Sequence, residues 1–288
     1  MRLRRSAMYV WEFSPEHIQE VINGCTDAIL FDMEDNVSPS NKAKARKDCV
    51  WALKNLDFKG KERVVRINDI TTDYYALDMA EVVAAGLPDT IRLPKCETVE
   101  GVRKVDQDLL KIEQSNGLEP NTIEIWAMVE NPIGIRNAYD IASQIKRVTV
   151  LAIGMQDFYR NMNIERHYLE NDVNISYARQ KVVLDAKAAG IQCMDAGLLN
   201  RDEEINNAYS EHARRLGFDG RAVVTEREAE YANKVFFPSA ATFDWTERLV
   251  AEYEKCDKEN RPCIVDGMLA CLAVYKHAKS ILDLKKYE

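Results

Sequence analysis

Short apolar runs alternate with longer stretches in which apolar residues recur at helical spacing, from one end of the chain to the other. The apolar runs are short and end in polar or charged residues, which is typical of buried strands. Eight such runs predict strands at residues 6–10, 28–31, 63–67, 90–93, 123–129, 149–153, 192–195 and 221–224.

The stretches between these runs carry recognisable helix starts. Ser14-Pro15 has the form of an N-cap followed by the first helical residue, Ser40 precedes a basic segment, and Thr98 precedes an amphipathic run that ends near Ser115. Regular alternation of strands and helices predicts parallel strands joined by right-handed crossovers. Eight such units favour a closed (β/α)₈ TIM barrel, with an open doubly wound sheet as the alternative.

The domain organisation follows from the absence of any Pro/Gly/Ser-rich linker or low-complexity block in the sequence. We expect one main domain, the barrel, over residues 1–242. Residues 243–288 form a C-terminal extension with two further predicted helices, at 245–255 and 268–284. This extension is expected to cover the barrel as a lid or to reach a neighbouring subunit.

Composition narrows the class of protein. At 288 residues and 46% hydrophobic content, the chain has the size of a single α/β barrel. The net charge of −8 gives no general reason to bind nucleic acid or anionic lipid. No apolar run approaches the roughly 18 residues that span a bilayer, so we expect a cytoplasmic protein. Seven scattered cysteines without a CxxC pair argue against structural disulfides and a zinc site.

Charged residues follow most of the predicted strands, at the end where barrel active sites form. Taken singly, each fits a solvated loop charge or a helix cap, and Asp32 and Asp195 fit that interpretation well. Taken together, carboxylates gathered on one rim would repel each other without a cation among them. The charged set comprises Asp32, Glu34, Asp35, Arg66, Lys95, Glu130, Asp157 and Asp195.

Glu130 and Asp157 are the most informative of these residues. They follow consecutive predicted strands, so both should emerge at the same end of one sheet. Mg²⁺ binds through one or two protein carboxylates and leaves its other positions to water and substrate. The four histidines lie away from the strand ends, which disfavours zinc and favours Mg²⁺ or Mn²⁺.

A second group of polar residues lies between Gly154 and Arg179. We predict a long loop here that binds substrate, with Arg160 or Arg166 holding a carboxylate in a bidentate fork. The alternative is a solvated surface excursion with internal ion pairs. The polar residues are Arg160, Asn161, Asn163, Glu165, Arg166 and Arg179.

Several motifs, in order along the chain, resemble those of the citrate lyase β subunit and its relatives among the HpcH/HpaI aldolases and malyl-CoA lyases. Those shared with the wider superfamily are Leu3-Arg-Arg-Ser6, Phe31-Asp-Met-Glu-Asp-Asn-Val37, Val65-Arg-Ile-Asn68, Arg92-Leu-Pro-Lys95, Val129-Glu-Asn-Pro-Ile-Gly134 and Gly154-Met-Gln-Asp-Phe-Tyr-Arg160. Those closer to the β subunit itself are Asn163-Ile-Glu-Arg166, Ala188-Ala-Gly-Ile-Gln192 and Leu216-Gly-Phe-Asp-Gly220.

The resemblance implies a (β/α)₈ barrel, typically a homotrimer, that uses Mg²⁺ to make or break a carbon–carbon bond between a keto acid and an acyl thioester. It implies that Glu130 and Asp157 are the metal ligands and that Arg66 lies beside the reacting carbonyl. Glu34 and Asp35 would orient metal-bound water or substrate. The substrate-binding residues would be Arg66, Lys95, Arg160 and Arg166.

The chain departs from the family pattern at three places. Trp11-Glu-Phe13 stands where relatives have a Pro-Gly turn, and Thr225-Glu-Arg227 replaces an Asn-Pro or His-Pro sequence. Cys271 stands where relatives carry an Asp that acts from a lid, and we expect it to be a packed helix residue without an environment that lowers its pKa. The metal and keto-acid half of the site is thus retained, while the thioester half is altered.

The sequence therefore supports a Mg²⁺-dependent carbon–carbon lyase as the first hypothesis. It would cleave a citryl-like or other 3-hydroxyacyl thioester, carried by CoA or an acyl carrier protein, to a 2-keto acid such as oxaloacetate and an acyl thioester. One alternative is a divalent-metal aldolase that acts on a free hydroxy-keto acid. Another is a catalytically degenerate binding or scaffolding subunit of a larger complex.

Overall fold

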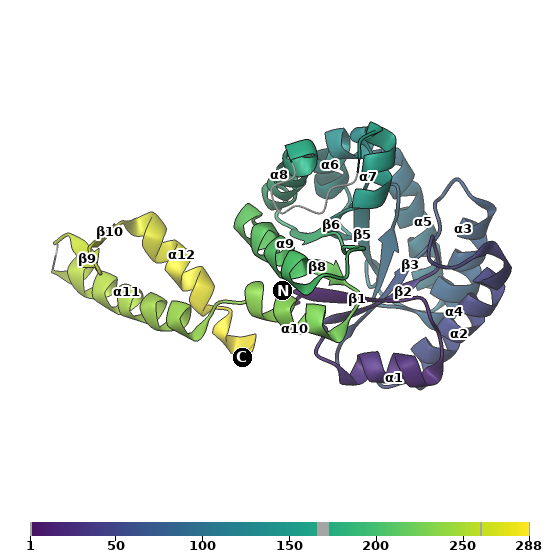
Figure 1. The fold of residues 1–288 in the computed structure, drawn as a ribbon, viewed down its shortest axis with the longest axis horizontal. Coiled ribbons are helices and arrows are strands. Elements are labelled where there is room, and N and C mark those ends of the chain that lie inside the picture. Colours follow the sequence, from purple (N-terminus) through teal and green to yellow (C-terminus); the bar gives the residue numbers. More distant parts are fainter. Residues whose placement is uncertain (1, 166–172, 260, 288) are drawn as a thin grey trace. The chain divides into compact units, whose positions relative to one another are not determined.

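The structure, a computed structural model, describes residues 2–165, 173–259 and 261–287 (Figure 1). The chain divides into two compact units between Phe236 and Phe237. This division lies a few residues before the boundary at 242/243 that the sequence suggested.

The first unit is a closed barrel of eight parallel strands, in which each strand pairs with the next along the chain and β1 pairs with β8. The predicted (β/α)₈ barrel is therefore confirmed, and each predicted strand is found to within one residue at either end. The strands are β1 Ser6–Val10, β2 Ala28–Asp32, β3 Glu62–Arg66, β4 Thr90–Leu93, β5 Glu124–Val129, β6 Val148–Ile153, β7 Gln192–Asp195 and β8 Gly220–Val223.

Helices surround the strands (Figure 1). Two of the predicted starts are confirmed in detail, because Ser14 accepts a hydrogen bond from the His17 amide and Thr98 accepts one from the Gly101 amide. The helices of this unit are α1 Pro15–Asn23, α2 Lys42–Asn55, α3 Asp73–Asp78, α4 Ala84–Gly86, α5 Val99–Ser115, α6 Pro132–Gln144, α7 Met155–Met162, α8 Val173–Ala188, α9 Glu203–Leu216 and α10 Glu226–Val235.

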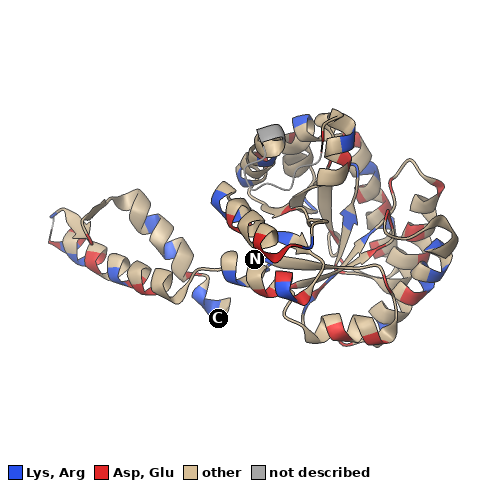
Figure 2. Ribbon diagram, in the orientation of Figure 1, with Lys and Arg blue, Asp and Glu red and all other residues tan. Residues whose placement is uncertain are grey.

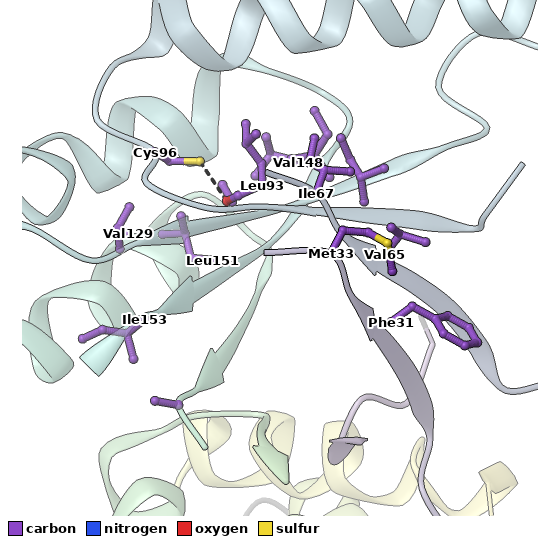
Figure 3. Packing of buried hydrophobic residues seen from close by; sticks show 14 of the residues in the cluster. Phe31, Met33, Val65, Ile67, Leu93, Cys96, Val129, Val148, Leu151 and Ile153 are labelled. Atoms are coloured by element: carbon purple, nitrogen blue, oxygen red, sulfur yellow. Dashed lines mark hydrogen bonds between the residues drawn. The ribbon is translucent and has the colours of Figure 1, made fainter. Parts of the chain in front are cut away.

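Apolar side chains pack on both faces of the strands. Figure 3 shows the layer between the strands and the helices, with Val65, Leu93 and Leu151 among its buried members. A smaller cluster, which includes Leu30 and Trp126, fills the barrel interior. Because successive strand residues point to opposite faces, every second residue of a strand faces the interior. This alternation determines which charged strand residues point into the barrel interior.

A buried ionic network closes the barrel at the N-terminal end of the strands. The Arg4 guanidinium donates to both carboxylate oxygens of Glu62, at 2.7 and 2.9 Å, and to Gln192 at 2.9 Å. Thr90 donates to the same Glu62 carboxylate at 2.6 Å. This end of a barrel commonly serves stability, and the network leaves the opposite end for chemistry.

The second unit contains α11 (Ala240–Lys258), the hairpin β9 (Cys263–Val265) and β10 (Met268–Ala270), and α12 (Leu272–Leu282). The predicted helix at 268–284 is wrong at its start, because Asp266 and Gly267 adopt φ angles of 50° and 79° and reverse the chain. Two consecutive left-handed residues, with Asp-Gly in sequence, favour a tight hairpin turn.

Cys271 is the second correction in this unit. It is exposed and stands at the N-cap position of α12, where its side chain forms no capping hydrogen bond, so the expectation of a packed helix residue is wrong. Backbone N–H groups of Val274 and Ala273 lower the pKa of its thiol, contrary to expectation.

The distribution of surface charge and the hydropathy of the helices are relevant to what the protein can bind. Figure 2 shows Lys and Arg interspersed with Asp and Glu on the helices around the barrel. None of the helices in the described part of the chain has the length and apolar character needed to cross a membrane.

Candidate active site

A cavity of about 330 Å³ opens at the C-terminal ends of the barrel strands. Four residues of the charged set predicted from the sequence line it: Asp35, Arg66, Glu130 and Asp157. Arg66 faces inward as the last residue of β3, two positions beyond Val64 in the interior cluster. Part of the charged set that was predicted at the strand ends therefore does lie around one cavity.

Arg66 forms one side of the site with two buried carboxylates. Asp32, the last residue of β2, receives two hydrogen bonds from Arg66, at 2.7 Å from Nε and 2.6 Å from Nη2. The Glu34 carboxylate lies 2.8 Å from the Nη1 atom of Arg66. Burial favours a raised pKa for Asp32, but the Arg66 guanidinium outweighs it and the pKa is lowered. Asp32 is therefore the ionised counter-ion that orients Arg66.

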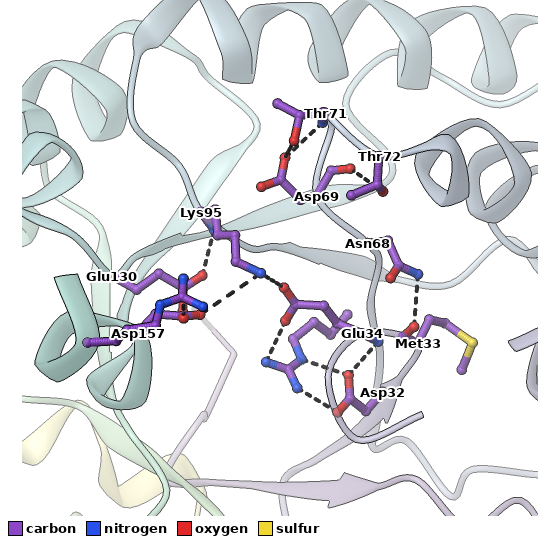
Figure 4. Close-up of polar contacts among 12 residues, drawn as sticks. Asp32, Met33, Glu34, Asn68, Asp69, Thr71, Thr72, Lys95, Glu130 and Asp157 are labelled. Atoms are coloured by element: carbon purple, nitrogen blue, oxygen red, sulfur yellow. Dashed lines mark hydrogen bonds and ion pairs between the residues drawn. The ribbon is translucent and has the colours of Figure 1, made fainter. Parts of the chain in front are cut away.

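A buried lysine anchors the loop that carries Glu34. Lys42 on α2 donates from Nζ to the carbonyl oxygens of Met33 and Glu34, at 2.7 and 2.9 Å, and to Asn68 at 2.8 Å. The Asn68 amide also donates to the Met33 carbonyl, a contact drawn in Figure 4. These bonds hold the loop after β2 against the loop after β3.

Glu130 follows β5 and is only 2% exposed. Its carboxylate accepts a hydrogen bond of 2.7 Å from the backbone N–H of Lys95, which takes a left-handed φ of 51°. Gly154, just after β6, lies so close that a Cβ atom there would collide with the Glu130 carboxylate. A glycine at this position therefore leaves room for Glu130 to point into the cavity.

Asp157 lies in the first turn of α7, directly after β6. One of its oxygens is 2.8 Å from an Arg160 guanidinium nitrogen, and the other is 3.9 Å from the Lys95 ammonium. The same ammonium also pairs with Glu34 (Figure 4). Lys95 thus bridges the Glu34 and Asp157 sides, and it lines a smaller neighbouring hollow instead of the main cavity.

Glu130 is a buried carboxylate with too little positive charge nearby to compensate its negative charge. Burial, together with the nearby carboxylates of Glu34 and Asp157, raises the pKa of Glu130 to about 8. Burial also raises the pKa of Glu34, despite its contacts with Arg66 and Lys95. A cation bound beside Glu130 and Asp157 would relieve this repulsion.

The donor atoms also indicate which cation would fit. They are carboxylate oxygens, the ligands of hard ions such as Mg²⁺. Across the described residues, no three His, Cys, Asp or Glu side chains are grouped so as to hold a metal by themselves. The pair therefore fits an ion that takes its remaining ligands from water and substrate, as Mg²⁺ does.

The long substrate-binding loop predicted after Gly154 is wrong in its first half. Residues 155–162 form α7, because Met155, Phe158 and Tyr159 make a buried helical face. Arg160 on its other face is largely exposed. Arg179 belongs to α8 and forms a buried ion pair with Asp195, and neither residue lines the cavity. Arg166 lies outside the described residues.

Sequence reasoning missed several residues that line the cavity. The most consequential is Arg92 on β4, a residue quoted as part of a motif but assigned no role. The available signal was the alternation of side chains along β4. Thr90 contacts the interior network, and Arg92, two residues later, points to the same face of the strand. The other missed lining residues include Tyr9, Met128, Gln156, Leu198 and Arg201.

Comparisons with known proteins agree with this architecture. The family described as HpcH/HpaI aldolase/citrate lyase matches residues 5–225. The citrate lyase subunit beta of Haemophilus influenzae is 30% identical over 289 residues, which cover 99% of this chain and 98% of that protein.

Two solved structures show the same fold. A citrate lyase from Burkholderia xenovorans LB400 has a TM-score of 0.86 at 18% identity, over 100% of this chain and 93% of that chain. The citrate lyase beta subunit from M. tuberculosis, complexed with oxaloacetate and magnesium, has a TM-score of 0.68 at 23% identity, over 83% of this chain and 100% of that chain. With the family match and the relative of near-equal length, these likenesses confirm the resemblance found in the motifs: the chain belongs to the HpcH/HpaI aldolase/citrate lyase family.

Proposed function

We propose that the protein is a Mg²⁺-dependent carbon–carbon lyase of the citrate lyase β type, which releases or condenses a 2-keto acid such as oxaloacetate. One observation carries this proposal: Glu130 and Asp157, from consecutive strand ends, line a single cavity together with Arg66. The citrate lyase relatives, and the neighbour complexed with oxaloacetate and magnesium, support the same reaction class.

Glu130 and Asp157 would hold the metal. When bound, Mg²⁺ supplies a Lewis acid and a positive charge for the carboxylate and carbonyl oxygens of the keto acid. Lys95 fixes Glu130 through its backbone N–H, and Gly154 leaves space for the carboxylate. Glu130 is thus oriented by the backbone before any ion arrives, while Asp157 is held by the side chains of Arg160 and Lys95.

Arg66 has the role of stabilising negative charge on the acyl half of the substrate. Cleavage of a 3-hydroxyacyl thioester removes the hydroxyl proton, breaks the bond between C2 and C3, and leaves the electron pair on a thioester enolate. Asp32 engages two of the five N–H donors of Arg66, and Glu34 faces a third. The remaining donors are available to the enolate oxygen, in a buried site where such bonds are strong.

Glu34 and Asp35 are assigned to orienting substrate and metal-bound water. Asp35 is exposed and lines the cavity, so it can accept the hydroxyl proton of the substrate or hold a water that does. Glu34 lies behind the cavity wall and acts through Arg66 and Lys95, both of which it contacts.

The test is turnover of citryl-CoA, with oxaloacetate release followed by coupled NADH oxidation. We expect Mg²⁺-dependent release that falls at least roughly 100-fold in Asp157→Asn and Glu130→Gln. Asp69→Asn is the matched control, since Asp69 follows β3 at the same end but does not line the cavity. Turnover that is independent of Mg²⁺, or that survives both substitutions, would refute the proposal.

A second candidate is an aldolase that cleaves a free hydroxy-keto acid to a 2-keto acid and an aldehyde. The observation that favours it is Trp11, whose bulky side chain lines the cavity mouth where relatives have a Pro-Gly turn. The volume of about 330 Å³ also lies at the low end for ligand pockets. Release of keto acid from a free 4-hydroxy-2-keto acid, but not from citryl-CoA, would select this function.

Two further expectations remain predictions. Mg²⁺ binding without turnover of either substrate would identify a degenerate binding subunit. The homotrimer that the family resemblance implies is tested by light scattering of the purified protein.

A further inference from the structure

Arg92 is a buried arginine on the wall of the cavity. It faces the barrel interior from β4, and its backbone pairs with Arg66 of β3 on one side and Trp126 of β5 on the other. Its side chain is 1% exposed and lines the same cavity as Glu130 and Asp157. Two arginines therefore lie on adjacent strands at the same level of the barrel.

The two arginines differ in their partners. Arg66 is held by Asp32 and Glu34. Among residues 2–165, 173–259 and 261–287, no carboxylate forms an ion pair with Arg92, and its Nε atom is buried without a hydrogen-bond partner. The contact found for its guanidinium is the Tyr9 ring, 5.5 Å away, which Arg66 also approaches at 5.2 Å.

An unpaired buried guanidinium is costly, because desolvation of its charge is not repaid by an anion or by hydrogen bonds. A ring face repays only part of this cost. The cavity that Arg92 lines is open to small molecules, so the missing anion can be supplied by a ligand. A carboxylate suits a guanidinium best, through charge-assisted bonds that can be bidentate.

We propose that Arg92 binds a second carboxylate of the substrate, so that the preferred keto acid is a dicarboxylate. This inference rests on the proposed function, in which the carboxylate next to the keto group is taken up on the Glu130 and Asp157 side. Asp32 and Glu34 engage three of the five Arg66 donors, and the proposed function assigns the others to the enolate oxygen, which leaves Arg92 as the cavity cation for the far carboxylate. Arg92 thus determines which keto acid is preferred, while the residues on the Glu130 and Asp157 side serve the bond-breaking reaction.

The test compares oxaloacetate with pyruvate, which has the same keto-acid head but lacks the second carboxylate. Both are titrated calorimetrically, with Mg²⁺ present, into the native protein, Arg92→Met and Arg92→Lys. We expect native protein to prefer oxaloacetate. In Arg92→Met the oxaloacetate affinity should fall roughly 10- to 100-fold, the range for hydrogen bonds to charged groups, while the pyruvate affinity stays the same. Arg92→Lys should restore part of the loss as a point charge.

Pyruvate binding also reports whether the variant site is intact, so a folding defect is recognised at once. An oxaloacetate affinity that is unchanged in Arg92→Met, or a pyruvate affinity that falls equally, overturns the assignment of Arg92. If neither keto acid binds native protein with Mg²⁺, the proposed function fails, and the dicarboxylate assignment fails with it. A wrong assignment of Arg92 is therefore seen in the Arg92→Met variant, whereas a wrong proposed function is already seen in the native protein.

Discussion

Replacing Arg66 with methionine should strongly destabilise the barrel, while the same change at Arg92 should not. Methionine keeps most of the apolar stem and removes the charge. In Arg66→Met the carboxylates of Asp32 and Glu34, which are 0% and 4% exposed, lose their shared cation. In Arg92→Met no carboxylate of the described residues loses an ion-pair partner.

The magnitude follows from the burial of the ion pairs. Removing one partner of a buried salt bridge costs about 3–5 kcal/mol, because the other charge is left uncompensated. For a barrel of this size, about 1 kcal/mol shifts the midpoint of thermal unfolding by roughly 2–4 °C. The expected loss in Arg66→Met is therefore roughly 6–20 °C, against a change of no more than a few degrees in Arg92→Met.

The pH dependence gives a second readout of the same ion pair. In the native protein the pKa of Asp32 is lowered, so the stabilisation is complete above about pH 4 and is lost as the pH falls further. In Arg66→Met burial, the largest influence on this pKa, is opposed by the hydrogen bonds from Glu34 and Asn36 but no longer by Arg66 and raises the pKa, so the variant should lose stability as the pH rises above about 4. The stability gap between the two proteins should therefore widen from pH 4 to pH 7.

Thermal unfolding followed by circular dichroism, without ligand and at pH 4, 5.5 and 7, measures both effects. Equal losses in Arg66→Met and Arg92→Met would refute the distinction between a paired and an unpaired arginine. A gap between native protein and Arg66→Met that narrows with rising pH would show that Asp32 is not the counter-ion.

Three further predictions concern the metal side, the Glu34 loop and the far end of the barrel. Because the pKa of Glu130 is about 8 without ligand and Mg²⁺ requires the ionised form, Mg²⁺ affinity measured by calorimetry should rise roughly tenfold per pH unit up to about pH 8 and then level off; a flat profile would contradict this. Lys42→Met removes the lysine donor from three buried acceptors, of which the Met33 and Glu34 carbonyls keep other donors, the Asn68 side chain and the Val37 N–H, so we expect a stability loss of about 3 kcal/mol in denaturant unfolding and roughly tenfold weaker oxaloacetate binding, through the loosened Glu34 loop; unchanged stability would count against this anchor. Arg4→Met should cost about 3–5 kcal/mol, because among the described residues the buried Glu62 keeps only the partly exposed Arg2 as an ion-pair partner, yet leave oxaloacetate affinity unchanged, and a parallel loss of affinity would contradict the separation of the two barrel ends.

The barrel could be predicted from the sequence because its eight strands are buried on both faces and therefore form short apolar runs between helix caps. The hairpin of β9 and β10 was missed because its strands have only three residues each and carry no such pattern. The Asp266-Gly267 pair was the local signal for its turn.

The candidate site was predictable only where charge and strand ends coincide. Glu130 and Asp157 stand just after apolar runs, so their convergence follows from parallel topology. Side-chain pairing between distant elements decides which carboxylates face the cavity and which do not. Asp195 on β7, for example, forms an ion pair with Arg179 on α8, and the local sequence around either residue does not indicate this pairing. Arg92 was overlooked because a charged residue inside a buried strand is recognised as exceptional only once its partners are known.

The metal-dependent keto-acid site is tested most directly by calorimetric titration of purified protein with oxaloacetate, with and without Mg²⁺, in native protein, Glu130→Gln and Asp157→Asn, with Asp69→Asn as the control. We expect binding that requires Mg²⁺, weakens at least roughly 100-fold in both site variants and persists in Asp69→Asn. Binding without Mg²⁺, or binding that both site variants retain, would contradict a metal-dependent keto-acid site at the end of β5 and β6.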